Sequence, residues 1–416
     1  MVTLTSHAIF SRFKQPFYLY SFMMLLGILA GLSHQFYLQA MGLFISDLFI
    51  RIFKFISLPI IILSIIVTIS HYANDGTLQR LWKKTLFYTF STTLIAASIS
   101  CFLFLFIKPG NVDALQTAAP LATKQTYLDH ITAIIPQNII SPFLEQQVMT
   151  VLFLGILIGI AIRFIPNKEA KKTIQLFFQG FHGIFFIITQ WVVKILPLGV
   201  FGFMTATIVQ LQHNINLTSL LQYLEVIVVA NLIQGLVILP IWLWVKGIKP
   251  FDTMKKMSPA LTLAFFSKSS AGTLPVTIQT AENALKMNPK IARFVLPICT
   301  TLNMNGCAAF IFTTVIFLMQ NNGVDITVYT LGVWILIATI AAIGNAGVPM
   351  GCFFLSASLL TSMNIPIVLL GLILPFYTII DMIETTLNVW SDSCVAKVVD
   401  KEEGEFEPDL VPANDD

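Results

Sequence analysis

The residues most able to do chemistry lie together near the end of the chain, in a segment that is otherwise apolar. If this segment is helical, their spacing puts them on one stripe about 100° wide. The members of the stripe are Asp381, Glu384, Thr385, Asn388 and Asp392. An ionised acid at the middle of a bilayer costs at least ~2.5–3.5 kcal/mol, and Lys268 is the one candidate intramembrane base nearby in sequence. One base in a packed polar seam cannot neutralise three acids, so the stripe favours binding of cations and ammonium groups.

A cation and an amino acid would each find complementary groups here. Asp392, with Asn303 and Asn388, offers hard oxygen donors suited to Na⁺. Asp381 offers a carboxylate to a substrate ammonium group, while helix N-termini at nearby chain breaks favour a substrate carboxylate. These residues predict an amino acid that is transported together with Na⁺.

Two interrupted apolar stretches must position these groups. Residues 257–281 form two short arms around a Ser/Gly tip at 267–273, and each arm spans about half a bilayer as a helix. Residues 326–380 contain no charge, and Gly, Asn and Pro at 344–351 break the run. Because such breaks are tolerated at membrane depth only inside protein or at a polar cavity, we expect two re-entrant hairpins, the second over about 327–362.

The elements next to the hairpins are also unusual. Residues 288–320 are apolar but contain two Asn and a Gly at 303–306, which indicates a locally unwound helix. The polar stripe lies on a last helix over about 366–398. Paired interrupted segments of this kind predict a transporter whose binding site lies at the interface of two repeats.

Composition and the loops define the rest of the chain. Charged residues make only 11% of it, against about 25% in soluble domains, which excludes a water-soluble protein. Apolar runs predict six helices before residue 250, with the second and fifth long and tilted. Basic residues gather in alternate loops, at 74–84, 163–172 and 246–256. The positive-inside rule therefore predicts a multi-pass protein of the plasma (inner) membrane with both termini cytoplasmic.

Two further features suggest no site. The five cysteines are Cys101, Cys299, Cys307, Cys352 and Cys394, odd in number and without a CxxC spacing. We interpret them as small core residues and not as a disulfide framework or zinc site. From Asp400 onward eight acids face one base, Lys401, which predicts a disordered acidic tail over 400–416.

Several motifs, in order, resemble the dicarboxylate/amino acid:cation symporter family, which includes the glutamate transporter homologues. Residues 269–277 look like its first hairpin tip, and residues 344–349 resemble its second tip. Residues 303–306 (Asn-Met-Asn-Gly) resemble its NMDG motif, and residues 381–392 resemble its D-x-x-R-T-x-x-N-V-x-x-D pattern. Earlier in the chain, residues 196–202 look like its P-x-G-V-F stretch. The resemblance covers essentially the whole chain. It implies an all-α elevator-type transporter with eight transmembrane helices, two re-entrant hairpins and inverted repeats, assembled as a homotrimer.

The resemblance also implies a division of the chain and roles for matching positions. The domains would be 1–79 and 112–212 (scaffold), 80–111 and 213–399 (transport domain) and the tail. Substrate would contact Ser269, Ser270, Gly347, Asp381, Glu384, Thr385 and Asn388. One Na⁺ would lie at Asn303, Asn388 and Asp392, a second at Thr301, Ala342, Ile343 and Asn345, and a third at Tyr88, Ser91, Thr92, Asn303 and Asn305, with Cys299 also among the expected ligands.

The chain departs from the family pattern in three ways. Asn305 replaces the Asp of NMDG, which removes a negative charge from the third cation position. Glu384 replaces the Arg that binds acidic side chains, and two carboxylates about 4 Å apart repel by about 4 kcal/mol at an effective dielectric near 20. A Glu here is similar to the serine/threonine branch, where it could accept a hydrogen bond from a substrate hydroxyl. Met350 and Cys352 replace small residues at the second tip, which could alter closure of the gate.

The preferred reading is a Na⁺-coupled symporter of a small neutral amino acid, with alternatives left open. If Lys268 pairs with Asp381, Glu384 is free to attract a basic substrate, and protonation of Glu384 would allow H⁺ coupling. Acidic amino acids or dicarboxylates are a further alternative. An intramembrane enzyme is disfavoured because Asp381 and Asp392 are eleven residues apart on one helix, too far to share a water. The hairpins would suit a channel, but a zwitterion site does not require one.

Overall fold

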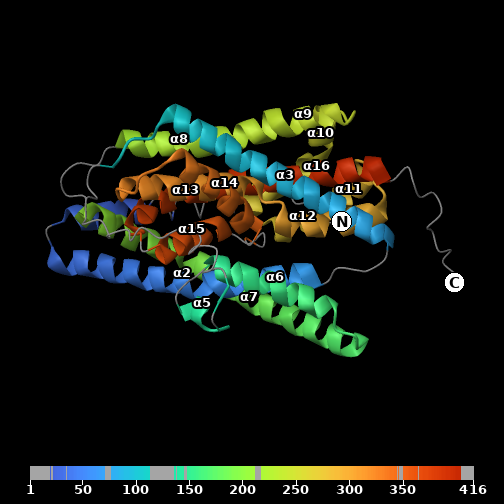
Figure 1. Cartoon of the computed structure of the whole chain (residues 1–416). Coiled ribbons are helices and arrows are strands. Elements are labelled where there is room, and N and C mark those ends of the chain that lie inside the picture. Colours follow the sequence, from blue (N-terminus) through green and yellow to red (C-terminus); the bar gives the residue numbers. More distant parts are fainter. Residues whose placement is uncertain are drawn as a thin grey trace.

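The computed structural model describes residues 19, 22–33, 35–70, 76–112, 135–136, 138–144, 148–210, 217–343, 345, 350–363 and 365–403. Every regular element in these ranges is helical (Figure 1). The all-α prediction is confirmed for this part of the chain. The predicted number of membrane-crossing helices and the elevator mechanism stay predictions.

The first half of the chain supplies long apolar helices. A helix over Phe22–Leu32 precedes α2 (Phe36–Ser70), α3 (Gly76–Ile107), α5 (Ser141–Leu144), α6 (Val148–Arg163) and α7 (Lys168–Gln210). Next come α8 (Leu217–Ile233), the π-helical turn η1 (Gln234–Ile238) and α9 (Leu239–Val245). The long second and fifth helices are present as α2 with 35 residues and α7 with 43.

The second half is built from interrupted helices. It contains α10 (Pro250–Ser267), α11 (Ser270–Asn283), α12 (Pro289–Leu302), α13 (Asn305–Asn321), α14 (Val328–Ile343), α15 (Gly351–Ser362) and α16 (Val368–Glu403). Between α12 and α13, and between α14 and α15, the helices end and begin where the sequence predicts interruptions. The first tip is tighter than predicted: Lys268, in the left-handed region with φ 53°, ends α10, and Ser269 immediately caps α11 by accepting a hydrogen bond from Gly272 N.

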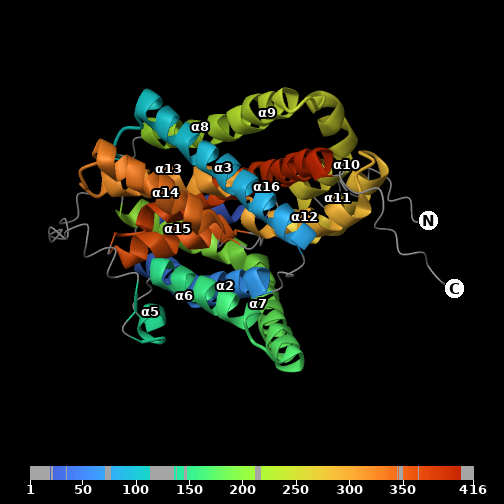
Figure 2. The same ribbon diagram turned by 45° about the vertical axis from the view of Figure 1, so that its right-hand side comes forward.

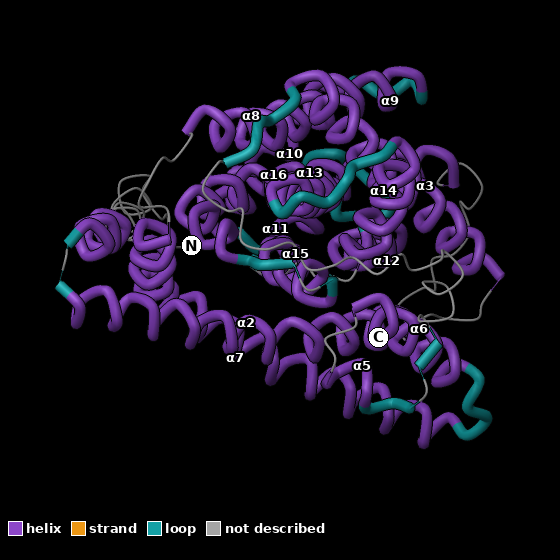
Figure 3. Tube along the Cα trace, turned by 60° about the vertical axis from the view of Figure 1, so that its left-hand side comes forward, coloured by secondary structure: helices purple, strands orange, loops and turns teal. Residues whose placement is uncertain are grey.

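The helices form two layers. α2, α6 and α7 pack on one another along one side of the molecule, and α2 and α7 run side by side there (Figures 2 and 3). On the other side α16 lies among α10, α11, α12 and α13, with α3 and α8 packed around them. This arrangement surrounds the polar stripe of α16 with the two breaks and the tip of the first hairpin.

The exterior fits a lipid environment. Phe44 on α2, Phe102 on α3 and Phe181 on α7 are exposed, as are many other large apolar side chains, which is typical of a surface that contacts membrane. Three described segments are long and apolar enough to cross a bilayer, Arg80–Ile107, Thr218–Val245 and Pro289–Asn321, and the two bent parts of α7 together count as a fourth.

The predicted start of the acidic tail is wrong. α16 continues through Glu403, because its last turn is paired with other helices and not solvated alone. Glu402 lies 2.6 Å from Lys246 Nζ and 3.0 Å from Lys84 Nζ, and Lys84 also contacts Glu403 at 2.5 Å. Residues 404–416 lie outside the described residues.

Candidate functional site

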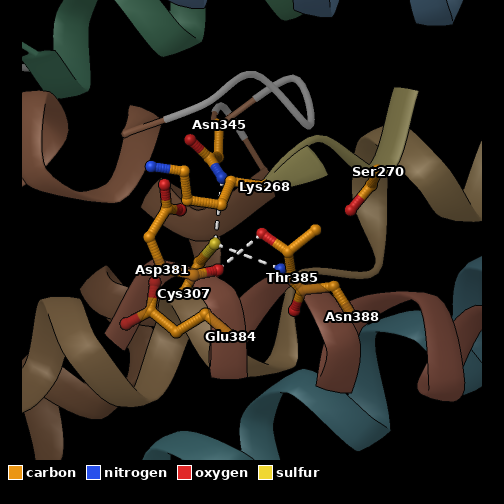
Figure 4. A pocket seen from close by; sticks show the side chains of 8 residues that line it. All are labelled: Lys268, Ser270, Cys307, Asn345, Asp381, Glu384, Thr385 and Asn388. Carbon is orange, nitrogen blue, oxygen red and sulfur yellow. Dashed lines mark hydrogen bonds between the residues drawn. The ribbon is translucent and has the colours of Figure 1, made fainter. Parts of the chain in front are cut away.

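A small polar cavity lies where the breaks meet α16. Its volume is about 10 Å³, room for about one water molecule. Side chains from the first hairpin tip, α13, the second break and α16 point toward it (Figure 4). The lining residues are Lys268, Ser270, Cys307, Asn345, Asp381, Glu384, Thr385 and Asn388.

The three acids of the stripe are buried. Asp381 is 4% exposed, and Glu384 and Asp392 are each 1% exposed. One carboxylate oxygen of Asp381 (Oδ2) and one of Glu384 (Oε1) have no hydrogen-bond partner among the described residues. Lys268 points its ammonium toward Asp381 without forming an ion pair (Figure 4). Because burying an uncompensated carboxylate is costly, the cavity is suited to positively charged groups.

Tyr377, which was not predicted from the sequence, contacts a residue that lines the cavity. Its hydroxyl lies fully buried and donates a hydrogen bond to Glu384 Oε2 at 3.2 Å. Tyr377 lies seven residues before Glu384, two turns earlier on the same face of α16, and that spacing was a signal available in the sequence. The bond orients the Glu384 carboxylate and leaves Oε1 free.

The predicted substrate residues occupy different positions around the cavity. Ser270, 3% exposed, lines it, whereas Ser269 uses its hydroxyl as the cap of α11. Thr385 donates to the Asp381 carbonyl at 2.7 Å. Asn388 accepts from Gly306 N at 2.9 Å, which satisfies an amide at the start of α13. Gly347 lies outside the described residues.

Asp392 lies deeper, in a set of polar groups without a base. Asn303 Nδ2 donates to Asp392 Oδ1 at 3.0 Å and to Ser391 Oγ at 2.8 Å, and the Thr300 hydroxyl lies 3.5 Å from Asp392 Oδ2. Ser391 and Thr300 were not among the predicted ligands. The carboxylate of Asp392 is a ligand suited to a small hard cation, but Asn303 turns its N–H side to it, so this amide would have to turn over to add an oxygen ligand. The side chain of Asn388, expected at the same position, instead bonds Gly306 and Cys307.

The position expected for a third cation is bridged by amide groups. Asn305 Nδ2 donates to Asn303 Oδ1 at 3.0 Å and also to Ser391 Oγ, while Gln234 Nε2 donates to Asn305 Oδ1 at 3.0 Å. The Thr92 hydroxyl lies 3.0 Å from Asn303 Oδ1. The side-chain oxygens of Asn303 and Asn305 already accept N–H bonds, so this neutral cluster does not fit a cation as it stands.

Other predicted cation ligands point away from that cluster. Tyr88 donates its hydroxyl to Glu402 at 2.8 Å, and Ser91 donates to the Phe87 carbonyl. Near the second break, Thr301 donates to the Ile298 carbonyl at 2.9 Å, the Ala342 carbonyl accepts from Asn345 N, and the Cys299 carbonyl accepts from Asn303 N. The side chain of Ile343 packs with Trp82 and Leu302. Among the described residues, the side-chain oxygens of these predicted ligands therefore do not converge on a common cation position.

The interpretation of all five cysteines as separate core residues is wrong for two of them. Cys307 and Cys352 form a disulfide although 45 residues separate them, because α13 and α15 both start beside the cavity. The spacing of the two cysteines along the chain held no signal for this contact. Cys101, Cys299 and Cys394 are buried and free.

Interrupted apolar helices around buried, unpaired acids are the architecture of a secondary transporter. Residues 18–402 match the model of the Sodium:dicarboxylate symporter family, and the chain belongs to this family. Its members are transporters and not enzymes, and membrane-embedded symport is their shared activity.

Individual relatives divide by the substrates in their names. The chain is 25% identical to the proton/glutamate-aspartate symporter of Escherichia coli (strain K12), over 93% of this chain and 92% of that protein. It is 28% identical to the proton/sodium-glutamate symport protein of Geobacillus stearothermophilus, over 89% of each. It is 26% identical to the neutral amino acid transporter B(0) of Oryctolagus cuniculus, over 84% of this chain and 71% of that protein. Sodium or proton coupling is general among such relatives.

Proposed function

We propose that this protein is a Na⁺-coupled symporter that imports a small neutral amino acid with a hydroxyl group, such as serine or threonine. One observation carries the proposal. The cavity contains two buried carboxylates, Asp381 and Glu384, each with an oxygen that lacks a hydrogen-bond partner among the described residues, and a third buried acid, Asp392, lies on the same helix.

Each acid has a separate role in this proposal. Asp381 binds the α-ammonium group, displacing the neighbouring ammonium of Lys268. Thr385, Asn388 and the first tip at Ser270 bind the α-carboxylate, since the N-terminus of α11 points there. Asp392, with Asn303 and Thr300, holds the co-transported Na⁺.

In this proposal the Glu384 carboxylate determines which type of substrate side chain binds. Tyr377 holds one of its oxygens, and the free oxygen can accept a hydrogen bond from a substrate hydroxyl. An acidic side chain would face this carboxylate with no base paired to it, and repulsion of about 4 kcal/mol corresponds to roughly 10³ in affinity. Glutamate and aspartate are therefore excluded from the proposal although several relatives are named for them.

The mechanism proposed for the whole molecule is an elevator movement. The layer of α2, α6 and α7 would serve as a fixed scaffold in a homotrimer of the plasma (inner) membrane. The layer of α3 and α8–α16 would carry substrate and cation across, with both chain termini in the cytoplasm.

A basic amino acid is the second candidate, and the charge balance of the cavity favours it. Lys268 points toward Asp381, and Glu384 has a free oxygen. If Lys268 stays with Asp381, the carboxylate left for the substrate is that of Glu384. A cationic side chain would neutralise it, whereas a hydroxyl would only form a hydrogen bond.

Uptake into proteoliposomes tests these candidates directly. Labelled serine, aspartate and lysine are offered in turn under a Na⁺ gradient and, separately, under an H⁺ gradient. We expect accumulation of serine under the Na⁺ gradient and little of aspartate. Preferred lysine uptake would select the second candidate, and an absence of any gradient-driven uptake would reject the transport proposal.

A further inference from the structure

The proposed transport cycle leaves the Cys307–Cys352 disulfide without a role. The bond joins the first turn of α13 to the first turn of α15. Cys307 also lines the cavity, and the Glu384 carboxylate lies within 4.8 Å of both sulfurs. Both cysteines are buried, 1% and 2% exposed. The disulfide therefore joins Cys307 of the cavity wall to the start of α15, which follows Asn345, another lining residue.

Entry of an amino acid requires a wall of this cavity to move. Its volume of about 10 Å³ is far below the roughly 300–1,000 Å³ of ordinary ligand sites. The wall between α13 and α16 is tightly packed, because Asn388 binds Gly306 N and a Cβ at Gly306 would lie 2.7 Å from Glu384 Cα. The wall at Asn345, in the chain between α14 and α15, is the better candidate for movement.

The cysteine pair joins α15 to α13 next to Asn345. Asn345, just before α15, donates through Nδ2 to Cys307 Sγ at 2.9 Å and to Cys352 Sγ at 3.4 Å. The disulfide holds the Cα atoms of the two cysteines 5.4 Å apart. As long as the bond is intact, α15 cannot separate from α13 at this point.

We propose that Cys307 and Cys352 are a reversible redox-modification site that locks the substrate pocket. The disulfide keeps α15 on α13 and excludes substrate, and reduction to two thiols lets α15 move away. This inference rests on the proposed transport function. It adds that the ratio of small thiols to small disulfides around the membrane controls the rate of transport.

The chemistry is thiol–disulfide exchange. A low-molecular-weight dithiol attacks one cysteine sulfur, the Cys307–Cys352 bond breaks, and a mixed disulfide forms. The second thiol of the reagent then attacks this mixed disulfide and releases the remaining cysteine as a thiol, while the reagent becomes a disulfide. In sum, two electrons and two protons pass from the dithiol to the protein, which gains two thiols, and the reagent leaves as a disulfide. A low-molecular-weight disulfide reverses the reaction.

Reconstituted full-length protein tests the lock. Proteoliposomes are treated with dithiothreitol or with hydroxyethyl disulfide, the state of the pair is read by mass spectrometry of the linked peptides, and Na⁺-driven uptake is measured for the three amino acids named above. We expect the reduced protein to transport about tenfold faster or more than the oxidised protein, with full reversal. Equal uptake by both verified states would overturn the lock.

Variants separate the lock from other thiol effects. Cys352→Ser should transport at the rate of the reduced protein under both treatments, while Cys394→Ser, at a buried free cysteine of α16, should respond as the unaltered protein does. Sensitivity that persists in Cys352→Ser contradicts the proposal. If Cys352→Ser folds poorly, Cys352→Ala serves instead.

A readout that needs no transport distinguishes the two proposals. Hydrogen exchange of the α15 amides should be slower in the oxidised protein than in the reduced one. If the reduced protein transports no amino acid, the proposed function fails. The exchange rates alone then test whether the disulfide restrains α15. Equal exchange in both states would reject it.

Discussion

Asp381 and Glu384 are one helical turn apart on α16 and share a cavity with one ammonium, that of Lys268. In the part of the chain that the structure describes, each carboxylate keeps one oxygen without a hydrogen-bond partner. In a medium of low polarity, an unpaired charge costs far more than an unpaired neutral group, so the type of side chain at these positions has a large effect on which solute binds.

Glu384→Arg should therefore change substrate preference. The guanidinium would attract an acidic side chain, so aspartate uptake should appear and serine uptake should fall by about tenfold or more. Competition among labelled serine, aspartate and lysine measures the change, and Glu384→Gln is the matched control that removes charge without reversing it. An unchanged preference in Glu384→Arg would remove this residue from the specificity argument.

Asp392→Ala should weaken Na⁺ dependence without changing which amino acid is preferred. The variant removes the one carboxylate that contacts Asn303, so the Na⁺ concentration for half-maximal uptake should rise by about tenfold or more. Uptake measured over a series of Na⁺ concentrations gives this value. If the Na⁺ curve stays where it is, Asp392 is not a ligand of the coupling ion.

Asn305→Asp should add a cation to the transport cycle. Asn305 now donates to Asn303 and accepts from Gln234; an aspartate would lose the first bond and supply a negative charge where both neighbours are neutral. We expect one more Na⁺ per substrate, measured from the membrane potential at which net flux reverses. Asn305→Ala is the control, and the same ratio in all three proteins would contradict the idea.

At the scale of elements, the breaks in the helices are stabilised by neighbours. Two residues, Asn303 and Met304, separate α12 from α13, and the freed amide of Gly306 is satisfied by Asn388 of α16. The absence of a side chain at Gly306 lets α13 approach the α16 backbone closely. The break and the helix that faces it thus form one structural unit.

Gly306→Ala should destabilise this unit. Its Cβ would meet Glu384 Cα at 2.7 Å, and forcing two packed backbones apart typically costs about 1–3 kcal/mol. We expect a lower melting temperature in detergent and weaker substrate binding, because the cavity lies at this contact. Gly332→Ala in α14, where a Cβ would meet nothing within 4 Å, is the control. Equal melting of both variants would contradict the close-packing argument.

At the scale of the whole molecule, charged groups join helices distant in sequence. Glu402, at the end of α16, accepts hydrogen bonds from Lys246 after α9 at 2.6 Å and from Tyr88 of α3 at 2.8 Å. Lys84 on α3 adds an ion pair at 3.0 Å. Burial opposes ionisation of Glu402, but hydrogen bonds from Lys246, Tyr88 and Lys84 outweigh it and lower its pKa to about 2. This cluster links α3, α9 and α16.

Glu402→Gln should destabilise the protein by about 1–2 kcal/mol near neutral pH. Because the folded pKa lies below the ordinary value of 4.5, the contribution of Glu402 is complete above pH 4.5 and is lost as the pH falls toward about 2. The melting temperatures of the two proteins should therefore differ at neutral pH and converge in acid. A difference independent of pH would show that the carboxylate charge is not responsible.

Much of the architecture follows from local patterns in the chain. Charge-free runs predict membrane helices because a helix that crosses the hydrocarbon core of a bilayer needs a long run of apolar residues. Gly, Asn and Pro predict the breaks at 303–304 and 344–350, since those residues interrupt helical hydrogen bonding. The spacing of Asp381, Glu384 and Asp392 predicts one buried stripe, because helical periodicity alone determines which residues share a face.

Contacts between segments that are distant along the chain depend on three-dimensional packing. The amino-acid sequence is sufficient to predict buried acids on interrupted membrane helices, and hence the class of the protein. It did not determine that Tyr88 would turn to Glu402, that Gln234 would reach Asn305, or that Cys307 would meet Cys352 across 45 residues. Such partners depend on how whole helices pack, and no local spacing along the chain encodes the distance between them.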